Sequence, residues 1–127
     1  MVIGIGIDII EINRIKQNVE KYGEKFLTKI YTSTEIEYCQ SKASKYQHFA
    51  ARFAAKEAVY KALATGWQEE LSWQDIEISN KPTGMPVANL KGKLKAFLSD
   101  NKDLKISISH SKNYVTCVAI IYKTNLK

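Results

Sequence analysis

Gly4, Gly6 and Asp8 alternate near the start of the 127-residue sequence. If these residues form a strand, period-two geometry places all three on the same face. The two glycines leave that face bare, so that another backbone or a ligand can approach closely, with Asp8 at its end. Glycines that only admit a helix, and an aspartate that only caps the next helix, would give the same pattern. A dinucleotide fingerprint does not fit, because its third glycine would fall at Ile9.

Glu57 and Lys61 stand four positions apart in an alanine-rich segment. On a helix they are neighbours on one face, and alone they would amount to an exposed ion pair worth roughly 0.3–0.5 kcal/mol. Ala50 and Ala54 thin the same face, so the glycine face of the first strand could approach and bring Asp8 towards Glu57. Two carboxylates beside a lysine suit Mg²⁺ bound to phosphate, since Mg²⁺ accepts one or two protein carboxylates and the lysine balances charge.

The histidines and cysteines add no recognisable metal site. His110 ends an apolar stretch, where a histidine is usually a structural hydrogen-bonding group and less often a ligand contact. His48 has no evident partner in the sequence. Cys39 and Cys117 lack metal-ligand spacing, and we expect two free thiols in a reducing compartment.

Hydrophobic periodicity predicts the elements that must position these side chains. The first strand is expected to be buried, with its odd-numbered isoleucines on one face. The predicted strands are Val2–Ile9, Asp75–Ser79, Val87–Asn89, Leu104–His110 and Tyr114–Lys123, with a turn at Lys81–Pro86. The predicted helices are Glu11–Tyr22, Phe26–Tyr31, a segment from Thr32 to Cys39, Lys45–Thr65, and a segment from Leu90 to Leu98. This is an α+β pattern, with one long helix on a mostly antiparallel sheet.

Capping residues and an apolar stripe refine the helix predictions. Thr32 with Glu35 forms a candidate capping box, and Ser44 with Gln47 forms another at the start of the long helix. The long helix is predicted to end at Gly66. Its apolar stripe is expected to consist of Phe49, Phe53, Tyr60 and Leu63.

Length and charge narrow the function class. The chain is long enough for one compact domain, residues 1–127, and its longest apolar run, Val118–Tyr122, falls far short of the roughly 20 residues of a membrane span. The apolar N-terminus lacks a basic leader, so we expect a cytoplasmic protein that does not bind membranes. The net charge of +6 is scattered and matches no nucleic-acid motif, so an anionic small ligand with an acidic protein partner fits at least as well.

Together these segments resemble the holo-acyl-carrier-protein synthase family, the small class of phosphopantetheinyl transferases. Two long matches carry the resemblance, and three short segments support it in order along nearly the whole chain. The long matches are Gly4–Ile15 and Arg52–Leu63, and the short ones are Ser72–Ile78, Gly84–Pro86 and Ser107–Ser111. Both long motifs at this spacing, in a chain of this length, are quite specific.

The resemblance implies a compact α+β chain that forms a homotrimer with active sites between neighbouring subunits. It implies Mg²⁺ ligation by Asp8 and Glu57 and a catalytic or phosphate-contacting role for Lys61. Arg52 and His110 match positions that face the phosphates of coenzyme A.

The resemblance also implies two binding surfaces. Gly84 and Pro86 match a loop that borders the nucleotide from the adjacent subunit, although Met85 stands where the family often has a lysine. Arg14, Lys25 and Lys29 fall in the region that meets the acidic acyl carrier protein.

The reaction expected from the resemblance is the transfer of 4'-phosphopantetheine from coenzyme A to a serine of the carrier protein, with release of adenosine bisphosphate, in fatty acid biosynthesis. Glu57, Asp8 or a water on the metal could accept the serine proton, and the sequence does not choose among them. Three alternatives stay open: a small basic nucleic-acid-binding domain, which needs only the net charge, another Mg²⁺-dependent phosphoryl-transfer enzyme using the same carboxylates, and a structural assembly module, which only the apolar strands favour.

Overall fold

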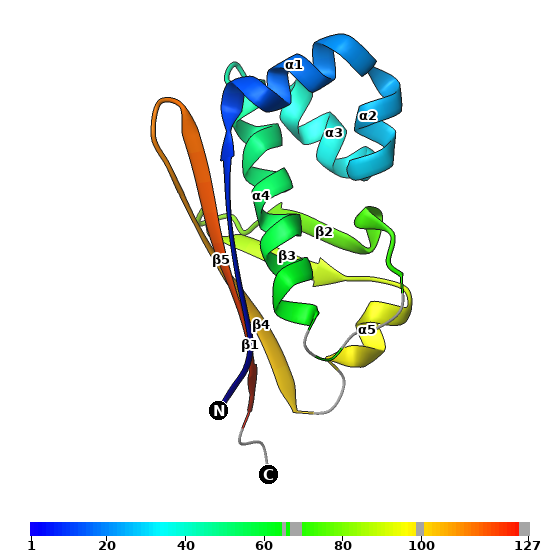
Figure 1. Cartoon of the computed structure of the whole chain (residues 1–127), viewed down its shortest axis with the longest axis vertical. Coiled ribbons are helices and arrows are strands. Elements are labelled where there is room, and N and C mark those ends of the chain that lie inside the picture. The colour runs from blue at the N-terminus through cyan, green and yellow to red at the C-terminus, as the bar shows by residue number, and fades with distance from the viewer. Residues whose placement is uncertain (65, 67–69, 99–100, 125–127) are drawn as a thin grey trace.

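Helix α4 (Lys45–Leu63) lies across one face of an antiparallel sheet with strand order β1–β5–β4 (Figure 1). The structure is a computed structural model and describes residues 1–64, 66, 70–98 and 101–124. The strands are β1 (Val2–Glu11), β4 (Lys102–His110) and β5 (Tyr114–Lys123), with a separate hairpin of β2 (Ile76–Asn80) and β3 (Pro86–Leu90). The shorter helices are α1 (Ile12–Tyr22), α2 (Glu24–Ile30), α3 (Ser33–Gln40), the 3₁₀ helix η1 (Trp73–Asp75) and α5 (Lys93–Phe97).

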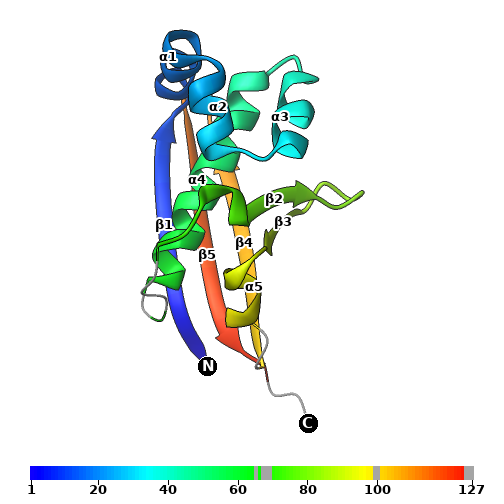
Figure 2. The ribbon, with the colours of Figure 1, turned by 90° about the vertical axis from the view of Figure 1, so that its right-hand side faces the viewer.

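The layers follow the predicted α+β class, and the long helix on an antiparallel sheet is confirmed. In Figure 2, α4 runs in front of the sheet, while the β2–β3 hairpin projects to the side away from β1. Helices α1, α2 and α3 gather around the N-terminal end of α4 (Figure 1). No described helix is both long and apolar enough to cross a membrane.

The glycine face of β1 packs directly on α4, as its bare surface predicts. A Cβ added at Gly6 would collide with the carbonyl oxygen of Ala58 and lie 2.7 Å from the backbone nitrogen of Ala62. A Cβ at Gly4 would meet the Ala62 carbonyl in the same way. The close approach therefore uses Ala58 and Ala62, about two turns further along the helix than the predicted Ala50 and Ala54.

The prediction that the isoleucine face of β1 is buried is wrong for a single chain. Ile5, Ile7 and Ile9 are 64%, 63% and 64% exposed. Because α4 occupies the glycine face, the alternating side chains point to the opposite side of the sheet. None of the described residues covers that side, so β1 presents a row of exposed isoleucines.

Helix α4 is buried on most of its circumference, so the predicted single apolar stripe is wrong. Phe49 and Leu63 are fully buried, but Tyr60 is exposed and Phe53 is only half-buried. The buried set also includes alanines and two charged residues, Arg52 and Lys56. The reason is that the sheet, α1, α3 and β2 all pack around this helix.

The helix ends show which capping patterns the chain uses. The Thr32–Glu35 capping box is present, but the Ser44 side chain makes no capping hydrogen bond. The long helix ends at Leu63, before the predicted Gly66, and the predicted last residue, Thr65, lies outside the described residues. The last predicted helix is shortened to α5, because Leu90 belongs to β3.

Candidate active site

Asp8 and Lys61 meet where the inner face of β1 contacts α4. The Lys61 ammonium lies 3.2 Å from Asp8 Oδ1 and also donates a hydrogen bond of 2.9 Å to the Ile7 carbonyl. Asp8 is mostly covered, whereas about half of the Lys61 side chain is exposed. Glu57 stands one helical turn before Lys61 on the same side of α4. The three residues predicted to do chemistry are therefore brought together.

Asp8 and Glu57 line one pocket, and their charges interact. Partial burial raises the pKa of Glu57, the negative charge of Asp8 raises it further, and Lys61 lowers it. Two carboxylates that repel each other in a partly buried site favour a bound cation. Lys61 supplies part of that positive charge in the chain itself.

A pocket of about 270 Å³ opens beside these carboxylates. Asp8 and Glu57 line it together with Arg14 and Asn18 of α1 and Phe53 of α4. Sequence reasoning assigned Arg14 to the partner surface and missed Asn18. The signal was available, because residues 14 and 18 are four apart on a helix that follows Asp8 directly.

The donor set fits a hard divalent cation. Among the described residues, no group of three or more histidines, cysteines and carboxylates gathers as a metal cluster. Asp8 and Glu57 instead offer carboxylate oxygens from two elements, which suits Mg²⁺, an ion that keeps waters or phosphate oxygens in its remaining positions.

Arg52 lies on another side of α4, in a buried polar cluster. Its side chain is covered, with the residue 4% exposed, and its guanidinium stacks 4.2 Å from the ring centre of Tyr38. Nη2 donates to Asn80 Oδ1 at 3.0 Å, whereas buried Nε has no hydrogen-bond partner within the described part of the chain. Asn80 Nδ2 in turn donates to the Gly84 carbonyl at 3.1 Å, which ties Arg52 to the β2–β3 turn.

Positive charge concentrates around Arg52. His48 packs edge-on against Tyr38, and burial lowers its pKa, with further lowering from the positive charges of Arg52, Lys42 and His110. His110 ends β4 on this side, and sequence reasoning gave it a ligand role but gave His48 none. The group has the charge to receive a phosphate.

The turn between β2 and β3 has the predicted glycine geometry. Gly84 adopts φ +92°, a left-handed conformation that favours glycine, and its amide donates to the Lys81 carbonyl at 2.7 Å. Pro86 begins β3, and exposed Met85 lies between them. Lys81, Met85 and Pro86 line a pocket of about 280 Å³ with residues of β4, including Lys105.

One chain does not bring the two groups together. Arg52 and Glu57 are five positions apart, which places them about 140° apart around the helix axis at about 100° per residue. Glu57 faces Asp8 on β1, whereas Arg52 faces α3 and β2. Helix α4 therefore separates the carboxylates from the basic cluster.

The predicted partner residues Lys25 and Lys29 lie together on α2. With Tyr22 and Phe26 they line a shallow pocket of about 400 Å³. Sequence reasoning identified the lysines but missed the two aromatic rings. Their spacing of four residues was the available signal.

Comparisons with known proteins agree along nearly the whole chain. A family model of the 4'-phosphopantetheinyl transferase superfamily matches residues 4–119. A holo-[acyl-carrier-protein] synthase of Chlamydia muridarum is 48% identical over 122 residues, 96% of this chain and 96% of the relative. One from Protochlamydia amoebophila is 46% identical over 120 residues, 94% of this chain and 98% of the relative.

Solved structures show the same fold. The crystal structure of holo-[acyl-carrier-protein] synthase from Neisseria meningitidis matches with a TM-score of 0.87 and 30% identity, covering 97% of this chain and 100% of that one. The Helicobacter pylori enzyme, solved in complex with coenzyme A, matches with a TM-score of 0.78 and 38% identity, covering 93% of this chain and 99% of that one. The chain thus belongs to the holo-[acyl-carrier-protein] synthase family of 4'-phosphopantetheinyl transferases.

Proposed function

We propose that this chain, as a single transferase domain, moves 4'-phosphopantetheine from coenzyme A to a serine of apo-acyl carrier protein and releases adenosine 3',5'-bisphosphate. The observation that carries the proposal is the meeting of Asp8, Glu57 and Lys61 between β1 and α4. The proposal places the reaction in the cytoplasm, in support of fatty acid biosynthesis.

Asp8 and Glu57 would hold Mg²⁺, which supplies charge neutralisation at the pyrophosphate of coenzyme A. Lys61 has the reach to stabilise the leaving phosphate oxygen, because about half of its side chain is exposed and its ammonium already lies beside Asp8. Glu57 is the proposed acceptor of the serine proton, because partial burial and the charge of Asp8 raise the pKa of its carboxyl group.

Coenzyme A phosphates would meet the basic cluster of Arg52 and His110, while Gly84 and Pro86 border the nucleotide. Arg52 Nε has no hydrogen-bond partner among the described residues, and this atom and the positive charge acting on His48 support an anion there. The Helicobacter pylori relative binds coenzyme A with the same fold.

The carrier protein would dock on the basic helices α1 and α2, through Arg14, Lys25 and Lys29. Arg14 lines the carboxylate pocket, and the two lysines lie beside Tyr22 and Phe26. This arrangement offers positive charge for an acidic surface and aromatic rings for an apolar side chain at its centre.

The assembly would be a homotrimer with each active site between neighbours. Two features support association: the exposed Ile5, Ile7 and Ile9 on β1, and the separation of Arg52 from Glu57 by α4. An Ile7→Asp variant is expected to shift the mass measured by light scattering towards the 14.4 kDa of one chain. A wild-type protein that is monomeric at micromolar concentration would exclude the shared site.

Intact mass spectrometry of apo-carrier protein tests the activity directly. Incubation with this chain, coenzyme A and Mg²⁺ should add one phosphopantetheine, and excess chelator should prevent the addition. Asp8→Ala and Glu57→Ala should nearly abolish transfer while thermal unfolding stays cooperative. The matched control is Glu37→Ala, which removes an exposed carboxylate of α3 and should transfer at the wild-type rate. An unmodified carrier protein with the wild-type enzyme would refute the proposal.

A further inference from the structure

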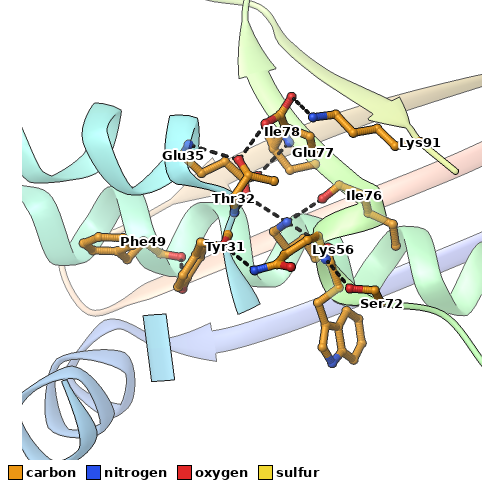
Figure 3. Close-up of polar contacts among 12 residues, drawn as sticks. Tyr31, Thr32, Glu35, Phe49, Lys56, Ser72, Ile76, Glu77, Ile78 and Lys91 are labelled. Atoms are coloured by element: carbon orange, nitrogen blue, oxygen red, sulfur yellow. Dashed lines mark hydrogen bonds and ion pairs between the residues drawn. The ribbon is translucent and has the colours of Figure 1, made fainter. Parts of the chain in front are cut away.

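A buried ammonium lies next to Glu57 in the sequence. Lys56 is 1% exposed, and its three N–H donors have three acceptors (Figure 3). Glu35 Oε1 lies at 2.8 Å, the Trp73 carbonyl accepts at 2.9 Å, and the Ile76 carbonyl accepts a shorter bond. One residue of α4 is thus bonded to α3, η1 and β2 at once.

Its partner Glu35 is equally covered and fully bonded. Besides Lys56, Oε1 accepts the Thr32 backbone N–H at 2.8 Å, and Oε2 accepts the Ile78 backbone N–H at 2.8 Å. The carboxylate therefore joins the start of α3 to β2, as Figure 3 shows. Directional bonds at both ends hold the pair in one orientation.

Glu57 stands between two fixed residues. On one side, Lys56 ties α4 to α3, η1 and β2 through its three acceptors, and on the other, the carbonyl of Ala58 is pressed against Gly6 of β1. Since β1 also carries Asp8, these two contacts set both the rotation of the helix and its distance from the second carboxylate.

We propose that the buried Lys56–Glu35 pair is a positioning pair that orients Glu57 towards Asp8. The proposal rests on the metal-binding role proposed for Glu57. A buried ion pair is a weak contributor to stability, because desolvation offsets most of its attraction. Its three directional bonds instead fix the rotation of α4, which an apolar side chain of the same length cannot do.

The test measures Mn²⁺ binding by calorimetry, with Mn²⁺ as a probe of an oxygen-donor site. Lys56→Met is expected to weaken Mn²⁺ binding about tenfold, the low end of the losses that follow removal of a group bonded to a metal ligand, because Lys56 acts on Glu57 only through the helix. Lys91→Met is the matched control, since it breaks the 2.9 Å ion pair between half-exposed Lys91 and mostly covered Glu77, at the far end of the same polar network. It should bind Mn²⁺ as the wild-type chain does.

Amide hydrogen exchange of the metal-free protein gives a second readout that does not depend on activity. Lys56→Met should lose protection around Glu57 while the first turns of α4 keep theirs. Glu35→Gln, which leaves at least one of the three donors at the carboxylate without an acceptor, should show a smaller change of the same kind, and it serves if Lys56→Met fails to fold.

Unchanged Mn²⁺ affinity with a lowered melting temperature in both variants would make the pair structural only and overturn the proposal. Uniform or absent exchange changes would overturn it as well. If the wild-type chain bound no Mn²⁺, the metal site of the proposed function would fail, whereas the exchange pattern would still decide whether the pair orients Glu57.

Discussion

Because α4 separates Asp8 from Arg52, two inactive variants should restore activity when their subunits mix. Asp8→Ala removes a carboxylate from one group, and Arg52→Met removes the guanidinium from the other while keeping an unbranched stem against Tyr38. In an assembly made of one variant alone, every shared site therefore lacks either the carboxylate or the guanidinium. A mixed assembly can pair an intact carboxylate group with an intact basic cluster from the neighbour.

The geometry of a closed ring sets the size of the recovery. Each head-to-tail interface is intact only when the subunit that supplies Asp8 carries the Arg52 change and its neighbour carries the Asp8 change. A ring of three that contains both variants has one such interface whichever variant is in excess, so about one third of its sites are complete. A mixed ring of two would have about one half.

Co-expression with two different affinity tags and sequential purification isolates the mixed assemblies. The rate of phosphopantetheine addition per subunit, followed by intact mass, should approach about one third of the wild-type rate. As the control, each variant is co-expressed with a differently tagged copy of itself and purified in the same way. These assemblies should stay inactive. Mixed assemblies without activity, from variants that melt as the wild type does, would refute the shared site and place every group in one chain.

Three further outcomes are expected. Gly6→Ala should lower the free energy of unfolding by about 1–3 kcal/mol in a denaturant titration, because the added methyl collides with the backbone of α4. A variant as stable as the wild type would contradict the close packing of β1 on α4. Lys25→Glu with Lys29→Glu should raise the KM for carrier protein severalfold and leave the KM for coenzyme A unchanged in steady-state kinetics, because both lysines lie on α2 outside the carboxylate pocket. The reverse pattern would move the docking surface elsewhere. Burial raises the pKa of Cys39 and of Cys117 to about 12, so both thiols stay protonated up to pH 9. A thiol reagent should therefore modify them only after denaturation, and rapid labelling of the native protein would contradict their burial.

The parts of the fold that sequence predicted are those fixed by local rules. Alternation located the strands, and the Thr32–Glu35 capping box located the start of α3, because each depends on residues within one or two turns. The approach of Asp8 to Glu57 was also predictable, since the Gly4 and Gly6 positions leave room for a helix. In each case the local sequence pattern is enough to predict the local geometry.

Two features could not be predicted in the same way: the buried Lys56–Glu35 ion pair, and the separation of the Asp8 and Glu57 carboxylates from the basic cluster around Arg52. Lys56 looks like any charged residue of an exposed helical face, and its burial depends on Glu35, η1 and β2, which come from distant parts of the chain. Likewise, Arg52 and Glu57 fall in one continuous motif, so the sequence suggests that they belong to one site. Only the packing of α3 and β2 on one side of α4, and of β1 on another, shows that Arg52 and Glu57 face different elements.

The isoleucine row and Asp8 lie on opposite faces of the same strand, β1. On β1, exposed Ile5, Ile7 and Ile9 alternate with Gly6 and Asp8, so an association that covers one face also fixes the strand whose other face carries Asp8, the proposed metal ligand. Dissociation would therefore reduce activity even if every catalytic group came from one chain, because β1 would lose support behind Asp8. Loss of activity on dilution cannot separate these cases. Complementation can, since it keeps the assembly intact and changes only which neighbour supplies each group.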